Sequence, residues 1–257
     1  METAQPVLGG DHRQTLASTS NLALCLSDQG NDAEAESFWR ATLAGQIRVL
    51  GEDHPDTLVT RSNLAMSLFK KSQYAEAESL WTVAWTSQKR ILGEDHPDTL
   101  RMLSNLATAM RLQGRRDEAE VYFRRCLDGF RRTLGDHHPQ TLASQQNLAK
   151  NFQEQGKLEE AEALFAKTLE TAAKVGSVDP VTLAAIHGNY GICLLKMERY
   201  AEAETEDLAS YEGLAAVAGP QHAKTLEAAG RLVDLYEAWN KPDKAAEYRA
   251  LLPRKEE

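Results

Sequence analysis

Residues 51–58 read Gly-Glu-Asp-His-Pro-Asp-Thr-Leu, and the chain repeats this octapeptide at a fixed interval. It returns unchanged at residues 93–100, and with three changes each at residues 135–142 and 9–16. Its Thr-Leu pair therefore falls at positions 15, 57, 99 and 141, a constant step of 42 residues, and degenerate pairs follow at 182 and 225. A fixed period of this length predicts a chain of similar supersecondary units, each packed on its neighbours.

Each repeat is predicted to hold two helices. In the first helix, apolar residues spaced by one, three and four, such as Leu64, Ala65 and Leu68, fall on one helical face. Glycine then ends this helix at Gly30, Gly114 and Gly156, as a left-handed cap requires. The second helix opens on paired glutamates, which suit the positive end of a helix dipole, and continues with a small residue followed four positions later by a large aromatic one. These small–aromatic pairs, expected to fill the space between helices, are Ala35/Trp39, Ala77/Trp81, Ala119/Phe123 and Ala161/Phe165.

The repeated pattern resembles the tetratricopeptide repeat family in its longer form of 42 residues, which is familiar from kinesin light chains and bacterial multidomain proteins. The resemblance implies an all-α fold: a right-handed α-solenoid superhelix of about six helix–turn–helix repeats. Repeat five departs from the pattern, because Asp207 stands where the aromatic residue belongs. We expect a shift of one residue there, with Leu208 filling the space instead.

We expect residues 9–257 to form a single array and residues 1–8 to be a tail or the remnant of a preceding helix, which would make the chain a fragment of a longer protein. The last repeat ends in a capping helix, since terminal repeats of such arrays are atypical. The expected repeats are 9–50, 51–92, 93–134, 135–175, 176–218 and 219–257.

Composition excludes several classes of function. The net charge of -9 argues against nucleic-acid binding, which needs clustered cations. The three cysteines are far apart and odd in number, so we expect free, buried thiols at Cys25, Cys126 and Cys193 and a reducing compartment. The chain lacks an apolar signal segment and a stretch long enough to cross a bilayer. A cytoplasmic protein without membrane contact is predicted.

The sequence contains few residues in patterns that would indicate a metal-binding or catalytic site. The recurring histidines His12, His54, His96, His138 and His222 lie on separate repeats, so they cannot converge on one metal ion, and hydrogen bonds within the loops are the expected role. No Ser or Cys comes with a motif that promises a neighbouring base, and no glycine-rich phosphate loop is present. We therefore expect no catalytic residue, metal or cofactor, and no enzymatic activity.

Asparagine recurs before the core residue of the first helix in repeats one to five. In tetratricopeptide proteins this helix lines the concave surface, so the resemblance implies a ladder of amides that can bond the backbone of an extended peptide. The alternative is that these amides hold neighbouring helices together, and both roles remain open. The asparagines are Asn21, Asn63, Asn105, Asn147 and Asn189.

Specificity is then expected from other groove positions of the first helices, whose mixture of apolar and cationic side chains favours an extended, acidic partner segment with a hydrophobic anchor. These positions include Met66, Phe69, Lys70, Arg101, Arg111 and Lys150. The lysine–asparagine clamp of chaperone-binding relatives is not expected, because Ser62 and Met66 occupy its slots.

The predicted function is a non-enzymatic scaffold that binds a protein or peptide in this groove. The main alternative is a structural spacer, or a self-association module that stacks through the ends of the array, within a larger signalling protein. An RNA-binding helical repeat is disfavoured by the charge and by the lack of stacking aromatics at repeating groove positions.

Overall fold

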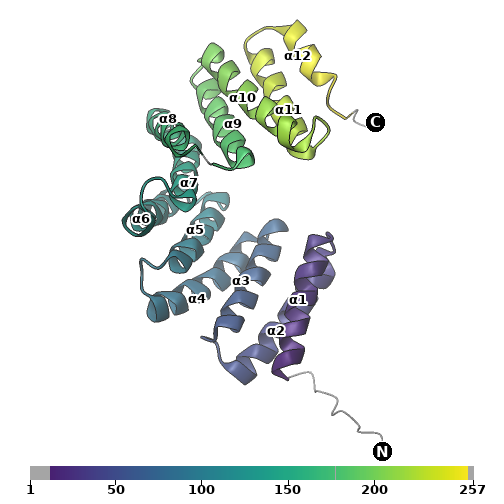
Figure 1. Ribbon diagram of the computed structural model, residues 1–257, viewed down its shortest axis with the longest axis vertical. Coiled ribbons are helices and arrows are strands. Elements are labelled where there is room, and N and C mark those ends of the chain that lie inside the picture. Colours follow the sequence, from purple (N-terminus) through teal and green to yellow (C-terminus); the bar gives the residue numbers. More distant parts are fainter. Residues whose placement is uncertain (1–11, 177, 254–257) are drawn as a thin grey trace, which may run out of the picture. The chain divides into compact units, whose positions relative to one another are not determined.

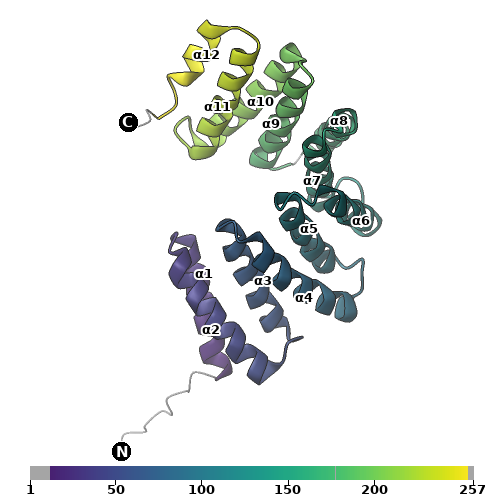
Figure 2. The same ribbon diagram turned by 180° about the vertical axis from the view of Figure 1, so that it is seen from behind.

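The computed structural model describes residues 12–176 and 178–253, and all regular structure in these residues is helical. The helices follow one another along the chain as hairpins (Figures 1 and 2). Their bounds are α1 Arg13–Asp28, α2 Asp32–Leu50, α3 Pro55–Lys70, α4 Tyr74–Leu92, α5 Pro97–Leu112, α6 Arg116–Leu134, α7 Pro139–Gln155, α8 Leu158–Val175, α9 Pro180–Lys196, α10 Tyr200–Ala218, α11 Ala223–Ala238 and α12 Pro242–Arg249.

The chain divides into two compact units, an N-terminal half (Met1–Gly129) and a C-terminal half (Phe130–Glu257). Within the N-terminal half, α1 to α5 pack in sequence, each on the next. Within the C-terminal half, α7 to α12 do the same. This succession of helix pairs confirms the predicted all-α fold of the tetratricopeptide type, in which odd-numbered helices are the first and even-numbered helices the second of each pair.

The recurring octapeptide works as a joint between repeats. Nδ1 of His96 accepts a hydrogen bond from the backbone N–H of Asp98 at 3.2 Å, so this histidine is the N-cap of α5, and the next residue, Pro97, occupies the first helical position. The same N-cap bond recurs at the starts of α1, α3, α7 and α11, which confirms the loop role predicted for the histidines. The threonine of the motif reaches back across the joint: Thr57 Oγ1 donates to the carbonyl of Gly51 at 2.9 Å.

The turn inside each repeat needs a left-handed residue. Gly30, Gly114 and Gly156 supply it with φ between +79° and +84°, as the sequence predicts. The corresponding turns in repeats two, five and six use Ser72, Glu198 and Asn240, with φ between +55° and +62°. These three residues adopt a backbone conformation that L side chains disfavour.

The small–aromatic pattern forms the core. Each of the four pairs is buried, with Trp81 1% and Phe165 0% exposed. Consecutive repeats are further joined by ion pairs, since the second glutamate of each pair meets a cation 35 to 40 residues later. These pairs are Glu36–Lys71, Glu78–Arg115, Glu162–Arg199 and Glu204–Lys244. The glutamates therefore join repeats as well as complementing the helix dipole.

Two predictions about individual side chains are wrong. Cys25 is exposed, whereas Cys126 and Cys193 are buried as expected, because the slot of Cys25 lies at the open side of α1. In repeat five the helix is not shifted by one residue: Asp207 itself occupies the buried position with 1% exposure, and Leu208 is only half-buried. The acid is accommodated by partners from neighbouring helices, described below.

Candidate ligand-binding surface on the first helices

The first helices of each half share one side of the chain. In the N-terminal half, α1 contacts α3, and Ser20 Oγ lies 3.3 Å from Thr60 Oγ1. Ser62 Oγ on α3 lies 3.4 Å from the sulfur of Met102 on α5. In the C-terminal half, α9 contacts both α7 and α11. We call these two surfaces the N-terminal first-helix face (α1, α3 and α5) and the C-terminal first-helix face (α7, α9 and α11).

The asparagines fall at equivalent places on these helices. Asn21 is exposed, and Asn63, Asn105, Asn147 and Asn189 are half-buried. Among the described residues, the side chains of Asn21, Asn63 and Asn105 make no hydrogen bond, so these three amides keep their donors and acceptors for other partners. Asn147 already has a polar partner.

The N-terminal first-helix face carries exposed apolar side chains. They reach from 39% to 58% exposure and come from all three helices. Isolated apolar residues are common on protein surfaces, but a group on one side of three adjacent helices is a candidate contact surface. The residues are Leu24, Val59, Met66 and Leu112.

The other positions predicted for this face divide into two groups. Lys70 and Arg101 are exposed, and Arg101 donates to Asp98 at 2.9 Å. Phe69 and Arg111 point away from solvent instead: the Phe69 ring packs on the rings of Tyr74 and Trp81 at 5.3 and 5.5 Å, and Arg111 is only 8% exposed. Both lie where the outer face of the helix turns into its core face, so helical spacing alone could not separate them.

A small apolar pocket lies at the edge of the N-terminal first-helix face. Its volume is about 280 Å³, and it lies where the end of α4 meets the starts of α3 and α5. Leu58, Val59, Ile91 and Leu92 provide its apolar lining. Asp53, Asp98 and Arg101 surround these side chains with charge.

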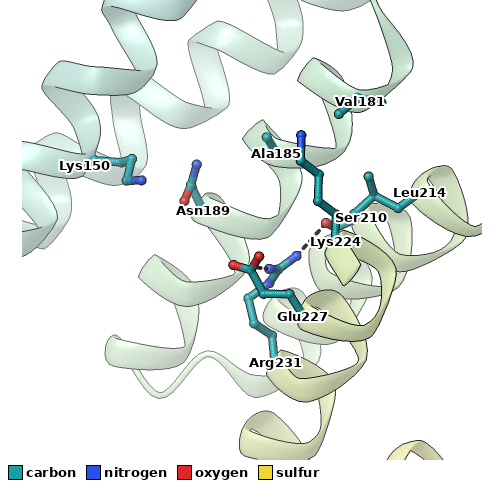
Figure 3. Close-up of a pocket in the computed structure, with 9 residues that line it drawn as sticks. All are labelled: Lys150, Val181, Ala185, Asn189, Ser210, Leu214, Lys224, Glu227 and Arg231. Carbon is teal, nitrogen blue, oxygen red and sulfur yellow. Dashed lines mark hydrogen bonds and ion pairs between the residues drawn. The ribbon is translucent and has the colours of Figure 1, made fainter. Parts of the chain in front are cut away.

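The C-terminal first-helix face holds a pocket of different character, which we call the α9–α11 pocket (Figure 3). Its volume is about 220 Å³. Lys150 from α7, with Lys224 and Arg231 from α11, brings three cations to it, and Glu227 brings one acid. The remaining lining residues are Val181, Ala185, Asn189, Ser210 and Leu214. Lys150 and Asn189, both predicted as groove residues, are thus brought together here.

A buried ion pair lies behind this pocket. Arg231 Nε is 3.5 Å from Asp207 Oδ1, and Arg231 Nη2 donates to Ser210 Oγ at 2.7 Å. Two glycines of α9 make the space: a Cβ at Gly188 would lie 2.4 Å from Arg231 Nη2, and one at Gly191 would lie 2.5 Å from Asp207 Oδ1. Burial raises the pKa of Asp207 to about 7, although the Arg231 charge acts to lower it.

Sequence reasoning missed Arg231, Lys224 and the two glycines as parts of a site. One signal was available. A carboxylate at a core position needs a cation, and Asp207 replaces a core aromatic, so a search for a buried arginine on the next helix would have led to Arg231.

In the described residues, the buried cysteines and the histidine of α9 do not gather into a thiolate or metal-binding group. Burial raises the pKa of the Cys126 thiol to about 12 and that of the Cys193 thiol to about 11, so neither supplies a thiolate near neutral pH. Among residues 12–176 and 178–253, no three His, Cys, Asp or Glu side chains gather as a metal site would require. His187 lies on α9 with Nδ1 2.6 Å from Glu206 Oε2, a single pair.

Membrane-spanning character is also absent from the described part of the chain, where every helix is too short or too polar to cross a bilayer.

Comparisons with known proteins agree with this architecture. The tetratricopeptide repeat model matches residues 14–81, 62–131, 98–174 and 182–248, which together cover most of the sequence. The chain belongs to the tetratricopeptide repeat family. No curated protein sequence matches it.

Solved structures similar to the chain come from several kinds of repeat protein. A putative kinesin light chain of Podospora anserina with nearly identical TPR-like repeats is 25% identical with a TM-score of 0.67, over 80% of this chain and 98% of that one. BtubC (BKLC) from P. vanneervenii is 18% identical with a TM-score of 0.65, over 95% of both chains. A Rap protein complexed with competence and sporulation factor is 16% identical with a TM-score of 0.64, over 92% of this chain and 75% of that one.

Proposed function

We propose that this protein is a non-enzymatic scaffold whose first-helix faces bind an extended peptide or protein segment. The observation that carries the proposal is the coincidence of exposed apolar side chains and unbonded amides on α1, α3 and α5. Apolar side chains provide affinity through burial, and amides can pair with a backbone whatever its sequence. A rigid helical surface needs little ordering when it binds.

The side chains of the N-terminal first-helix face suggest what kind of partner it would bind. Val59 and Met66 offer anchoring points for apolar side chains, while Lys70 and Arg101 stand at the same face as exposed cations. An extended segment that carries apolar and acidic residues satisfies both. Phe69 and Arg111 are left out of this proposal, because the half-buried Phe69 ring packs on Trp81 and Arg111 is only 8% exposed. The Rap structure, solved with a bound factor, supports ligand binding as a use of this fold.

The test begins with the immobilised full chain and a phage-displayed library of random peptides. A selected peptide is synthesised, and its dissociation constant is measured by titration calorimetry against the parent and an Asn63→Ala/Asn105→Ala variant. We expect the variant to bind about tenfold more weakly, because two amide partners of the peptide backbone are lost.

The matched control is Thr82→Ala/Thr86→Ala on the exposed side of α4, whose hydroxyls bond only their own helix. It should bind like the parent. Failure to select any peptide, or equal loss of affinity in both double variants, would contradict the proposal. Light scattering over a concentration series tests the self-association alternative, which requires the mass to rise with concentration.

A further inference from the structure

The α9–α11 pocket is lined both by apolar and by cationic side chains. Val181, Ala185 and Leu214 form an apolar wall, and Lys224 and Arg231 present cations beside it. Figure 3 shows these side chains converging from α9, α10 and α11, with Lys150 and Asn189 at the side of α7.

The local charge is opposite to that of the chain. The whole sequence carries a net charge of -9, yet the pocket lining holds three cations and one acid. That acid, Glu227, is 75% exposed and lies 3.8 Å from Arg231 Nη1, so water screens it strongly. An anion entering the pocket meets a positive surface in an otherwise acidic protein.

Arg231 is held in place before any ligand arrives. Its guanidinium is fixed by Ser210 on one side and by the buried carboxylate of Asp207 on another, in space that exists only because residues 188 and 191 have no side chain. A planar, fixed guanidinium loses little freedom when it pairs with a carboxylate, which it can grip with two parallel hydrogen bonds.

The ion pair has no counterpart in repeats one to four, where a buried aromatic residue, which we call the plug, fills the position of Asp207. In repeats one to four the position of Asp207 is an aromatic side chain, Trp39, Trp81, Phe123 or Phe165. The pocket cation thus depends on the departure that repeat five makes from the pattern.

We propose that the α9–α11 pocket binds a carboxylate carried by an apolar residue, with Arg231 and Lys224 pairing the anion and Val181 and Leu214 contacting the apolar group. This inference rests on the proposed function, since it names a chemical class for one part of the bound segment. A carboxylate fits better than a phosphate, because Arg231 and Lys224 match one negative charge while the Glu227 carboxylate, 3.8 Å from Arg231 Nη1, disfavours a second one. The carboxylate is either the free C-terminus of a peptide or an acidic side chain next to an apolar one.

The experiment uses N-acetyl-leucine as the probe, with chemical-shift titrations of the full ¹⁵N-labelled chain. Its amide, which has the same apolar group without the charge, serves as the matched ligand. We expect the acid to shift resonances of residues that line the pocket and to bind at least about tenfold more tightly than the amide. Equal binding of acid and amide, or tighter binding of inorganic phosphate, would overturn the proposal.

Two variants assign the contact. Arg231→Gln should weaken the acid about tenfold, and Lys224→Gln several-fold. Lys224 is exposed and remote from the buried pair, so its variant keeps the fold if Arg231→Gln does not. Lys167→Gln, the same charge change on the exposed side of α8, should have no effect. Unchanged affinity in both pocket variants, or an equal loss of affinity in the control, would contradict the proposed carboxylate site.

The source of the carboxylate is resolved by three short peptides: one ending on a free Leu carboxylate, its amidated form, and an amidated peptide with an internal Asp-Leu pair. Binding of the first or the third supports the site and tells the two sources apart, whereas equal binding of all three rejects it. Asn63→Ala/Asn105→Ala should bind N-acetyl-leucine normally. Loss of peptide binding at α1, α3 and α5 and loss of probe binding at this pocket are therefore separate results.

Discussion

The two halves of the molecule use the same helix pair in different ways. In the N-terminal half every repeat has its aromatic plug, and the first-helix face is decorated with exposed apolar side chains. In the C-terminal half repeat five replaces the plug with Asp207, and the first-helix face gains a pocket lined by cations, of which Arg231 is held by Ser210 and Asp207. The comparison shows that repeats with the small–aromatic pair build a regular scaffold, and that the cationic pocket lies where repeat five departs from this pair.

The largest effect on stability is expected when one of the aromatic plugs is removed. Trp81→Ala removes a side chain that is 1% exposed and contacts the Phe69 ring, so we expect the free energy of unfolding to fall by about 3–5 kcal/mol. Urea unfolding followed by circular dichroism measures it. Thr82→Ala, one residue away and exposed, is the control. A loss below about 1 kcal/mol would show that the plug is dispensable.

The next effect is the pH dependence of stability that comes from Asp207, the acid at the plug position of repeat five. The folded pKa of Asp207, about 7, lies above its ordinary value of 3.8, so the folded protein holds a proton that the unfolded chain has released. The stability from this group is therefore complete below pH 3.8 and is lost as the pH rises through 7. The charges that act on the group are Arg231, which lowers its pKa, and Glu206 and Asp234, which raise it.

Asp207→Asn removes this titration. The stability of the variant relative to the parent should rise between pH 5 and pH 7 by about 1.4 kcal/mol per pH unit. Urea unfolding at several pH values in one buffer system measures the difference. A constant difference across this range would contradict the raised pKa.

A smaller effect is expected from the glycines that make room for the pair. Gly191→Ala would place a Cβ 2.5 Å from Asp207 Oδ1 and should destabilise the protein by about 1–3 kcal/mol. Gly213→Ala is the matched control, because its nearest contact, Ala184 Cβ, lies at an ordinary 3.6 Å. The control should be neutral or stabilising, by up to about 1 kcal/mol, since alanine favours helix. Thermal unfolding separates the two, and equal effects would reject the packing argument.

The smallest effect tests the turns that lack glycine. Glu198 has φ of +59°, so Glu198→Gly should stabilise the C-terminal half by about 1 kcal/mol. Gly114→Ala, the opposite change at the equivalent turn of the N-terminal half, should destabilise by a similar amount. Differential scanning calorimetry of both variants measures the pair. Destabilisation by Glu198→Gly would mean that the side chain contributes more than the backbone strain costs.

Much of the fold could be predicted because its information is local and periodic. The 42-residue step, the N-cap histidines and the small–aromatic pairs each repeat, so one correct interpretation serves several repeats. The α9–α11 pocket could not be predicted in this way, because Asp207 and Arg231 are joined by a contact that has no counterpart one period earlier. Phe69 and Arg111 were hard to place for another reason: they lie at the border of a helical face, where spacing along the sequence does not separate the groove side from the core side.

The recurring ion pairs between consecutive repeats have a consequence for how such a chain can change its length. Because the Glu36–Lys71 contact recurs as Glu78–Arg115 and again further on, a duplicated or deleted stretch of 42 residues still brings an acid to a cation at the new boundary. The Asp207–Arg231 pair spans a boundary that no other copy can replace. That boundary also carries the Glu204–Lys244 pair of the recurring series, so an exchanged repeat there would keep the series contact and lose only the Asp207–Arg231 pair.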